Sequence, residues 1–194
     1  MRWLLLAVVV ALAGAWQGWT TRAIHHLPGE LASADPVQRP LGSGPMTFHR
    51  GDAQIVARAG FELEAVVIGR ERYRFDRMSK LVPVDVAFGW GPMSDSAVLS
   101  HLTISQSNRF YFWSTPEFSI PRRAIETHSA NMHLIPATDA IERRIENARV
   151  GQVVRLSGYL VDVKTTDGWA ISTSLTREDT GAGACEVIWV ESFD

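Results

Sequence analysis

Two stretches of this chain show the hydrophobic pattern of long β-strands. Residues 61–69 (FELEAVVIG) begin with alternating apolar and acidic side chains and continue with three aliphatic residues in a row. Alternation is typical of a strand with one buried face, and an aliphatic run is typical of a strand buried on both. Residues 153–163 (VVRLSGYLVDV) predict a second long strand with Gly158 at a bend or bulge. Thr165-Thr166-Asp167-Gly168 predicts a hairpin turn after it.

Shorter apolar runs predict the rest of the sheet. Residues 81–90 (LVPVDVAFGW) are apolar, but Pro83 indicates an edge strand or an irregular segment because proline has no amide hydrogen to donate. His128 to His133 precede Pro136, and Ser129 and Asn131 are expected to hold an irregular segment there. Further strands are expected as two short strands within residues 103–113 around Ser107-Asn108, at 169–174 and at 185–191.

Helices are expected in only two places. Residues 94–102 follow a possible cap at Ser94 or Asp95, and residues 138–148 begin at Thr138 or Asp139. The pattern therefore predicts a mainly β (α+β) domain, small and barrel-like, with two or three short helices. The block 153–163 and its hairpin is like the opening of an OB-type barrel, which makes OB-like the specific form suggested.

The amino-terminal segment predicts export. Residues 3–16 carry no charged or polar side chain, and a helix over 3–19 nearly spans a bilayer core. One interpretation is a cleaved signal sequence with an Ala13-Gly14-Ala15 site. The other is a transmembrane anchor, which we favour because Trp3, Trp16 and Trp19 mark both ends of the segment. Either one sends the rest of the chain across the membrane, and the anchor predicts a bacterial inner-membrane location, with a single pass and the carboxyl-terminal domain in the periplasm.

The expected organisation has three parts. Residues 1–24 form the anchor or signal, residues 25–46 a linker, and residues 47–194 a single exported domain. Within the linker, residues 28–45 hold four prolines and three glycines, a composition that resists helix and interior strand. Such a segment either runs extended along the domain surface or acts as a tether.

Charge and cysteine content exclude some function classes. All 21 acidic residues and all but two of the 19 lysines and arginines lie beyond residue 23, and the basic residues are dispersed. Nucleic-acid binding needs a concentrated basic face, so we expect no nucleic-acid partner. The membrane and an envelope protein are the expected partners. Cys185 is the single cysteine, which excludes an internal disulfide.

Four stretches together resemble a known group of proteins. They are PVDVAFGWGPMSD (83–95), HSANMHLIPA (128–137), GYLVDV (158–163) and SLTREDTGAGACEVIWVE (174–191). They resemble a family of uncharacterised bacterial membrane-anchored (exported) proteins with no assigned function. The resemblance implies export and a single domain, and it implies no catalytic residue, ligand or cofactor.

Several residues are candidates for chemistry. Asp179-Thr180-Gly181 has the letters of an aspartic-protease loop, but polar residues precede it, and we interpret it as a tight turn. Cys185 is interpreted as a small buried hydrophobe on the face of Val187 and Trp189. As a nucleophile it would need a base, for which His128 and His133 are the candidates. A metal site joining these histidines with His101, Asp139 or Glu142 lacks a ligand motif, so we expect neither metal nor cofactor.

Aromatic residues form the candidate ligand-binding surface. Trp90 lies in a Gly-Trp-Gly-Pro loop, and Arg109, Tyr111 and Trp113 share one face of an aromatic strand. Aromatic rings beside an arginine bind sugars, peptides or acidic groups, although such a strand is also commonly buried on both faces. The sequence thus predicts a non-enzymatic binding or assembly module of unknown ligand. The alternative is a small periplasmic hydrolase or thiol enzyme that uses Cys185 with His128 or His133.

Overall fold

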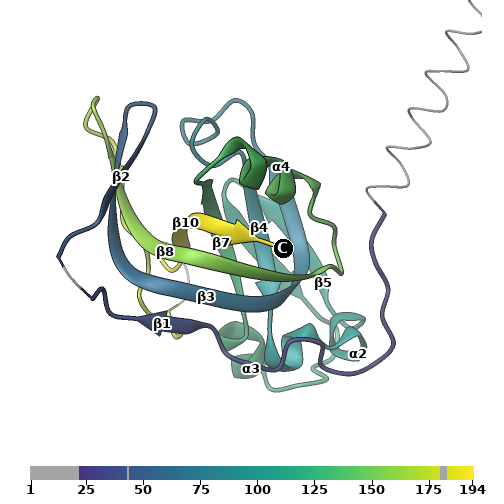
Figure 1. The fold of residues 1–194 in the computed structure, drawn as a ribbon. Helices are drawn as coiled ribbons and strands as arrows, with labels where there is room; N and C mark the ends of the chain where they lie inside the picture. The colour runs from purple at the N-terminus through teal and green to yellow at the C-terminus, as the bar shows by residue number, and fades with distance from the viewer. Residues whose placement is uncertain (1–21, 43, 180–182) are drawn as a thin grey trace, which may run out of the picture.

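The longest element of the fold is strand β3 (Ala53–Arg72). The computed structural model describes residues 22–42, 44–179 and 183–194. Side chains of β3 alternate between the interior and the surface up to Ala65, and the three residues that follow it are also buried. This confirms the reading of residues 61–69. β3 pairs with β8 (Val153–Thr165) along most of its length, with a bulge between Ala57 and Ala59. Figure 1 shows the two strands curving together.

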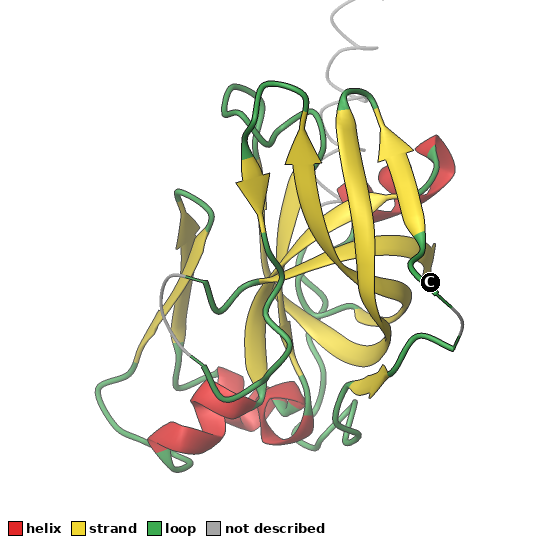
Figure 2. Cartoon of the chain, turned by 90° about the vertical axis from the view of Figure 1, so that its left-hand side faces the viewer, coloured by secondary structure: helices red, strands yellow, loops and turns green. Residues whose placement is uncertain are grey.

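The remaining strands and helices are short. The strands are β1 (Val37–Arg39), β2 (Thr47–Arg50), β4 (Val84–Gly89), β5 (Thr103–Ser107), β6 (Phe110–Ser114), β7 (Ser129–Pro136), β9 (Ala170–Ile171) and β10 (Glu186–Phe193). The helices are the 3-10 turn η1 (Gly91–Ser94), α2 (Ser96–Leu99), α3 (Arg122–Thr127) and α4 (Asp139–Asn147). Figure 2 shows the helices gathered at opposite ends of the sheet.

Five strands close a ring of backbone pairings in the order β3, β4, β7, β10, β8 and back to β3. The β7–β10 pairing is parallel, and the other four are antiparallel. Strands β1 and β2 extend the sheet from β3, and β9 extends it from β8, which gives eight strands. β5 and β6 form a separate hairpin. Over the described residues, the fold is therefore a mainly β, α+β domain with an eight-stranded mixed sheet and three short α-helices.

The core lies inside the ring. Every second residue of β3 from Ala59 to Val67 packs there against β4, β7, β8 and β10, and Ile141 and Ile145 of α4 cover one end. On the opposite face of β3, Val66 and Ile68 pack under η1, α2, α3 and the β5–β6 hairpin. The second cover explains why this part of β3 is buried on both faces.

Strand β4 corrects the expectation for residues 81–90. It is neither irregular nor at an edge: it lies between β3 and β7, and all six residues are buried. Pro83 precedes the first residue of the strand, so the ladder needs no amide hydrogen from it. Its carbonyl accepts a hydrogen bond from the Tyr73 amide at 2.9 Å.

Strand β7 is the second correction. The segment that contains Ser129 and Asn131 is a regular strand between β4 and β10. Its polar residues face outward and find partners there. The Ser129 hydroxyl donates to the Ile125 carbonyl at 2.7 Å, and the Asn131 amide donates to the Arg109 carbonyl at 3.0 Å. Because these partners satisfy the polar groups, the strand can lie in the middle of the sheet.

The other expected elements agree with the structure within a few residues. Asp95 and Thr138 cap α2 and α4 through their side chains. Asn108 and Arg109, both at positive φ, form the turn between β5 and β6. β9 is shorter than the expected strand at 169–174. At Gly158, a Cβ atom would lie 1.9 Å from the Trp189 carbonyl oxygen, and the register of β8 with β10 shifts beside it, between Val190 and Ser192, which agrees with the bend or bulge expected there.

Part of the proline-rich segment runs along the domain surface. Ala32 is buried and its carbonyl accepts a hydrogen bond from the Gly91 amide at 2.7 Å, while β1 pairs with β3. Of the two courses expected for residues 28–45, the extended one describes these contacts. Among the described residues, no helix combines the length and apolarity that a membrane span requires. The predicted span, residues 3–19, lies outside them.

Candidate functional site

A buried carboxylate on the outward face of β4 organises the site. Asp85 is fully buried, and its Oδ1 lies 2.7 Å from Arg109 Nη1 and 3.0 Å from His133 Nδ1. The His133 contact is mainly ionic, because the N–H direction does not satisfy hydrogen-bond geometry. Burying a carboxylate is costly unless it is paired, and here two cationic side chains share one acid.

Arg109 reaches Asp85 from the β5–β6 turn. The positive φ of Asn108 and Arg109 tightens the turn, and the Arg109 guanidinium lies over the Tyr73 ring at 3.8 Å. Its Nε and Nη2 also donate to Asp76 at 2.8 and 2.7 Å. The Arg109 guanidinium is therefore paired with two carboxylates. It does not line the pocket described below. Its predicted role in ligand binding remains untested, and its observed contacts are internal.

His133 connects Asp85 to the single cysteine. The imidazole is 3% exposed. Burial alone would lower the pKa of His133, but the adjacent Asp85 carboxylate, together with Cys185, outweighs burial and raises this pKa to about 9. The ring is therefore an imidazolium at neutral pH.

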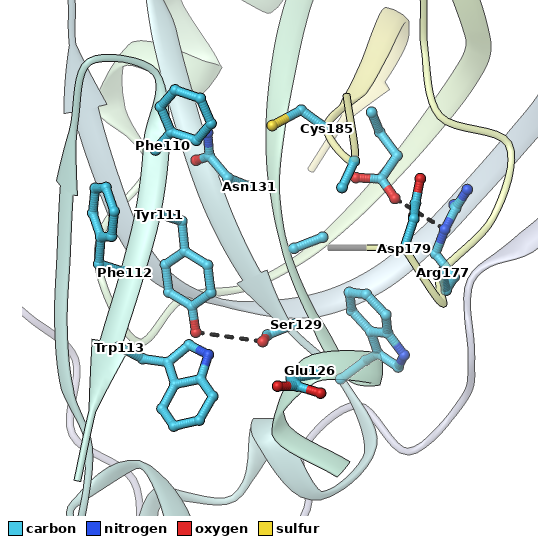
Figure 3. A pocket seen from close by; sticks show the side chains of 14 residues that line it. Phe110, Tyr111, Phe112, Trp113, Glu126, Ser129, Asn131, Arg177, Asp179 and Cys185 are labelled. Carbon is cyan, nitrogen blue, oxygen red and sulfur yellow. Dashed lines mark hydrogen bonds and ion pairs between the residues drawn. The ribbon is translucent and has the colours of Figure 1, made fainter. Parts of the chain in front are cut away.

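Cys185 is the member of this group that reaches open space. Its exposure is intermediate, whereas Asp85 and His133 are buried. Cys185 lines a pocket of about 240 Å³, and in Figure 3 its sulfur points toward the side where Phe110 and Asn131 lie. The row Asp85, His133, Cys185 thus ends with a thiol at a pocket wall.

Aromatic side chains form much of the pocket wall. They come from the loop before η1 and from β6: Trp90, Phe110, Tyr111, Phe112 and Trp113. The Tyr111 hydroxyl donates to Ser129 Oγ at 3.3 Å, and burial raises the pKa of Tyr111 to about 12. Three of the four residues predicted to bind ligand, Trp90, Tyr111 and Trp113, are therefore brought together at one pocket.

The inner end of the pocket is polar. Glu186 is 1% exposed, and its Oε1 lies 2.9 Å from Arg177 Nε. Arg177 also lies over the Phe61 ring at 5.4 Å. Burial raises the pKa of Glu186 to about 7, against the opposing charge of Arg177. A carboxyl group that titrates near neutrality in a pocket is typical of functional sites.

The Glu186 carboxyl makes stability depend on pH. In the folded protein it keeps its proton up to about pH 7, whereas in the unfolded chain it loses it near 4.5. Between these values the folded state binds more protons, so stability falls as pH rises. Glu186→Gln lacks this titration. We therefore expect the unmodified protein to lose about 3 kcal/mol of unfolding free energy relative to Glu186→Gln when the pH rises from 4.5 to 8. Urea denaturation at a series of pH values measures this difference, and parallel profiles would contradict it.

The structure places the two candidate histidines in different surroundings. His128 ends α3, where its Nδ1 lies 2.8 Å from the Ala124 carbonyl oxygen, and its ring packs over Gly91. His133 lies beside Cys185. Asp179 accepts a hydrogen bond from Ser174 at 2.8 Å, and residues 180–182 of the protease-like motif lie outside the described part of the chain. Among the described residues, no three His, Cys, Asp or Glu side chains are placed to hold a metal ion.

Sequence reasoning did not select Asp85, Glu186 or Arg177. Asp85 and Glu186 each carried a signal, since each is an acid inside an otherwise apolar run. No protein-family model, curated protein sequence or solved structure matches the chain. The case for a function therefore depends on the geometry of this site.

Proposed function

We propose that the domain acts through Cys185 as a nucleophilic thiolate, which exchanges with a disulfide ligand held in the aromatic pocket. The observation that carries the proposal is the row Asp85, His133, Cys185, in which the sulfur alone reaches the pocket. Reactive cysteines commonly lie beside a cationic side chain, and His133 is that side chain here. Asp85 keeps His133 charged, and Arg109 fixes Asp85 from the other side.

The position of His133 favours disulfide exchange over hydrolysis of an amide. Amide hydrolysis needs an acid that delivers a proton to the leaving amine. His133 is buried behind Cys185 and does not line the pocket. In exchange, the Cys185 thiolate attacks one sulfur of R–S–S–R′, the S–S bond breaks, and R′–S⁻ leaves and takes a proton from water. A second free thiol then releases R from Cys185, because the chain has no other cysteine.

Thiol reactivity across pH tests this proposal. We expect His133→Asn to slow the reaction of Cys185 with iodoacetamide and with 4,4′-dithiodipyridine by at least about tenfold at pH 6, because the thiolate loses its imidazolium. The difference should shrink at pH 9, where thiolates form without help. His128→Asn is the matched control and should react like the unmodified protein, and Cys185→Ser should not react. Equal rates for the two histidine variants at pH 6 would refute the role of His133.

A non-covalent binding or assembly module in the cell envelope is the second candidate. The observation that favours it is the exposed aromatic rim, where Phe110, Phe112 and Phe118 are 41%, 51% and 53% exposed. Exposed aromatic residues are enriched where proteins bind partners. Under this alternative, we expect the Cys185→Ser variant still to crosslink to its envelope partner in intact cells. The double variant Phe110→Ser, Phe112→Ser should lose this crosslink.

We propose that the protein is a single-pass inner-membrane protein, anchored through residues 3–19, with this domain in the periplasm.

We also propose that the domain is an OB-like barrel. The pairing order of the ring supports it, as does the position of α4 between β7 and β8. In this assignment β3 is the long bent first strand, and the block 153–163 belongs to the fourth strand. OB-type domains bind ligands on the second and third strands and the loops beside them, and the pocket lies at β7 and the segment before β10.

A further inference from the structure

Three buried side-chain atoms of residues that line the pocket have no hydrogen-bond partner among the described residues: Trp90 Nε1, Arg177 Nε and Glu186 Oε2. Arg177 Nε is ion-paired with Glu186 Oε1 at 2.9 Å, which leaves the indole nitrogen of Trp90 and Oε2 of Glu186 without a partner of either kind. Both side chains line the pocket, and each residue is 1% exposed. Buried polar groups are nearly always paired, so two unpaired ones in a single pocket call for an explanation.

The two atoms differ in what they offer. The Trp90 indole N–H can only donate a hydrogen bond. The free oxygen of Glu186 accepts one, while Oε1 faces Arg177 at 2.9 Å. The pocket end therefore presents one donor and one acceptor against aromatic walls. Arg177 is the cation at this end, and the pKa of Glu186, about 7, leaves its carboxyl partly protonated at neutral pH.

We propose that Trp90 and Glu186 bind an amide group of the ligand, so that the disulfide exchanged at Cys185 is one flanked by peptide groups. The amide carbonyl accepts from the Trp90 N–H, and the amide N–H donates to Glu186 Oε2. This inference rests on the proposed function and narrows it to cystine-containing peptides. Both unpaired atoms gain a partner from one planar group, which fits beside aromatic rings.

Charged ligand groups fit this end less well than an amide. A carboxylate would face the oxygen of Glu186, and an ammonium group would lie close to the guanidinium of Arg177. The raised pKa of Glu186, about 7, agrees with this preference because burial already disfavours charge at this position. A neutral group that both donates and accepts avoids these costs.

Two neutral disulfides separate amide recognition from thiol chemistry. One is the diamide of N,N′-diacetylcystine, in which amides flank the S–S bond, and the other is bis(2-hydroxyethyl) disulfide, which has hydroxyl groups only. Each rate is divided by the rate at which free N-acetylcysteine amide reacts with the same disulfide, which corrects for intrinsic reactivity. After this correction, we expect the full-length protein in detergent to form its mixed disulfide about tenfold faster with the diamide. One or two hydrogen bonds account for this ratio. Intact-protein mass spectrometry over time measures both rates.

Trp90→Phe assigns the preference to this end of the pocket. The substitution keeps an aromatic ring and removes the N–H donor, so the tenfold ratio should fall to about one. Trp189→Phe is the matched control: Trp189 is 8% exposed, stacks on Phe48 and does not line the pocket. It should keep the ratio.

Each outcome has a distinct meaning. If neither disulfide reacts with Cys185, the proposed function fails, and this inference fails with it. If both disulfides react at equal corrected rates, thiol exchange stands and amide recognition is refuted. A tenfold ratio that survives in Trp90→Phe would refute the assignment to Trp90. The comparison in the unmodified protein remains decisive if Trp90→Phe does not fold.

Discussion

Replacing Asp85 by asparagine is expected to lower the free energy of unfolding by about 3 to 5 kcal/mol. The substitution keeps the shape of the side chain and removes the one anion that His133 and Arg109 share. Arg109 then keeps only Asp76 as an anionic partner, and buried His133 loses its carboxylate partner. Denaturation by urea at pH 7 measures the loss.

The matched control for this prediction is Asp162→Asn. Asp162 pairs with Arg58 at 2.9 Å, but both side chains are partly exposed, at 29% and 49%. A surface pair of this kind contributes at most about 1 kcal/mol. Equal losses for Asp85→Asn and Asp162→Asn would show that Asp85 does not hold a buried charge cluster. Asp85→Asn should also slow alkylation of Cys185 at pH 6, because burial then lowers the pKa of His133 without opposition from a carboxylate.

Replacing Gly158 by alanine is expected to destabilise the fold by about 4 kcal/mol or more. An added Cβ would meet the Trp189 carbonyl oxygen at 1.9 Å and the Val190 Cα at 3.2 Å. These atoms belong to the backbone of β10, which is held between β7 and β8 and has little freedom to move. The expected signs are a lower urea midpoint and a lower melting temperature.

Gly60→Ala provides the comparison for this prediction. Gly60 lies within β3, opposite Tyr159, and the nearest atom to an added Cβ is 3.7 Å away. An ordinary contact at that distance should change stability by less than about 1 kcal/mol. Comparable destabilisation by the two alanines would mean that general strand effects, and not the contact with β10, determine the loss at Gly158.

Local patterns were sufficient to predict much of the secondary structure. The alternation in β3, the capped helix α4 and the turns near Asn108 and Gly168 each depend on a few neighbouring residues, and each is present. β4 and β7 were mispredicted because their environment is set by distant strands. A proline beside a strand and polar residues within one look unfavourable until their partners on other elements are known, as for Tyr73 with Pro83.

The candidate site was predictable only in part for the same reason. The pairing of His133 with Cys185 was one of two options, and the sequence offered no means to choose between His133 and His128. The parallel pairing of β7 with β10 decides it, because this register sets His133 opposite Val187, two residues after the cysteine. Asp85 joins through β4, in register with His133. Contacts between residues this far apart in the sequence produce no local pattern of hydrophobic and polar positions from which they could be predicted.

The order of the strands along the chain also determines when the site comes into existence. β10 follows every other strand, yet its pairings with β7 and β8 close the ring and bring Cys185 to His133. The ring cannot form until β10 has reached the compartment in which the domain folds, and contacts between distant segments form slowly. A nascent or incompletely folded chain therefore carries an ordinary thiol, and the thiol acquires its imidazolium partner only on completion of folding.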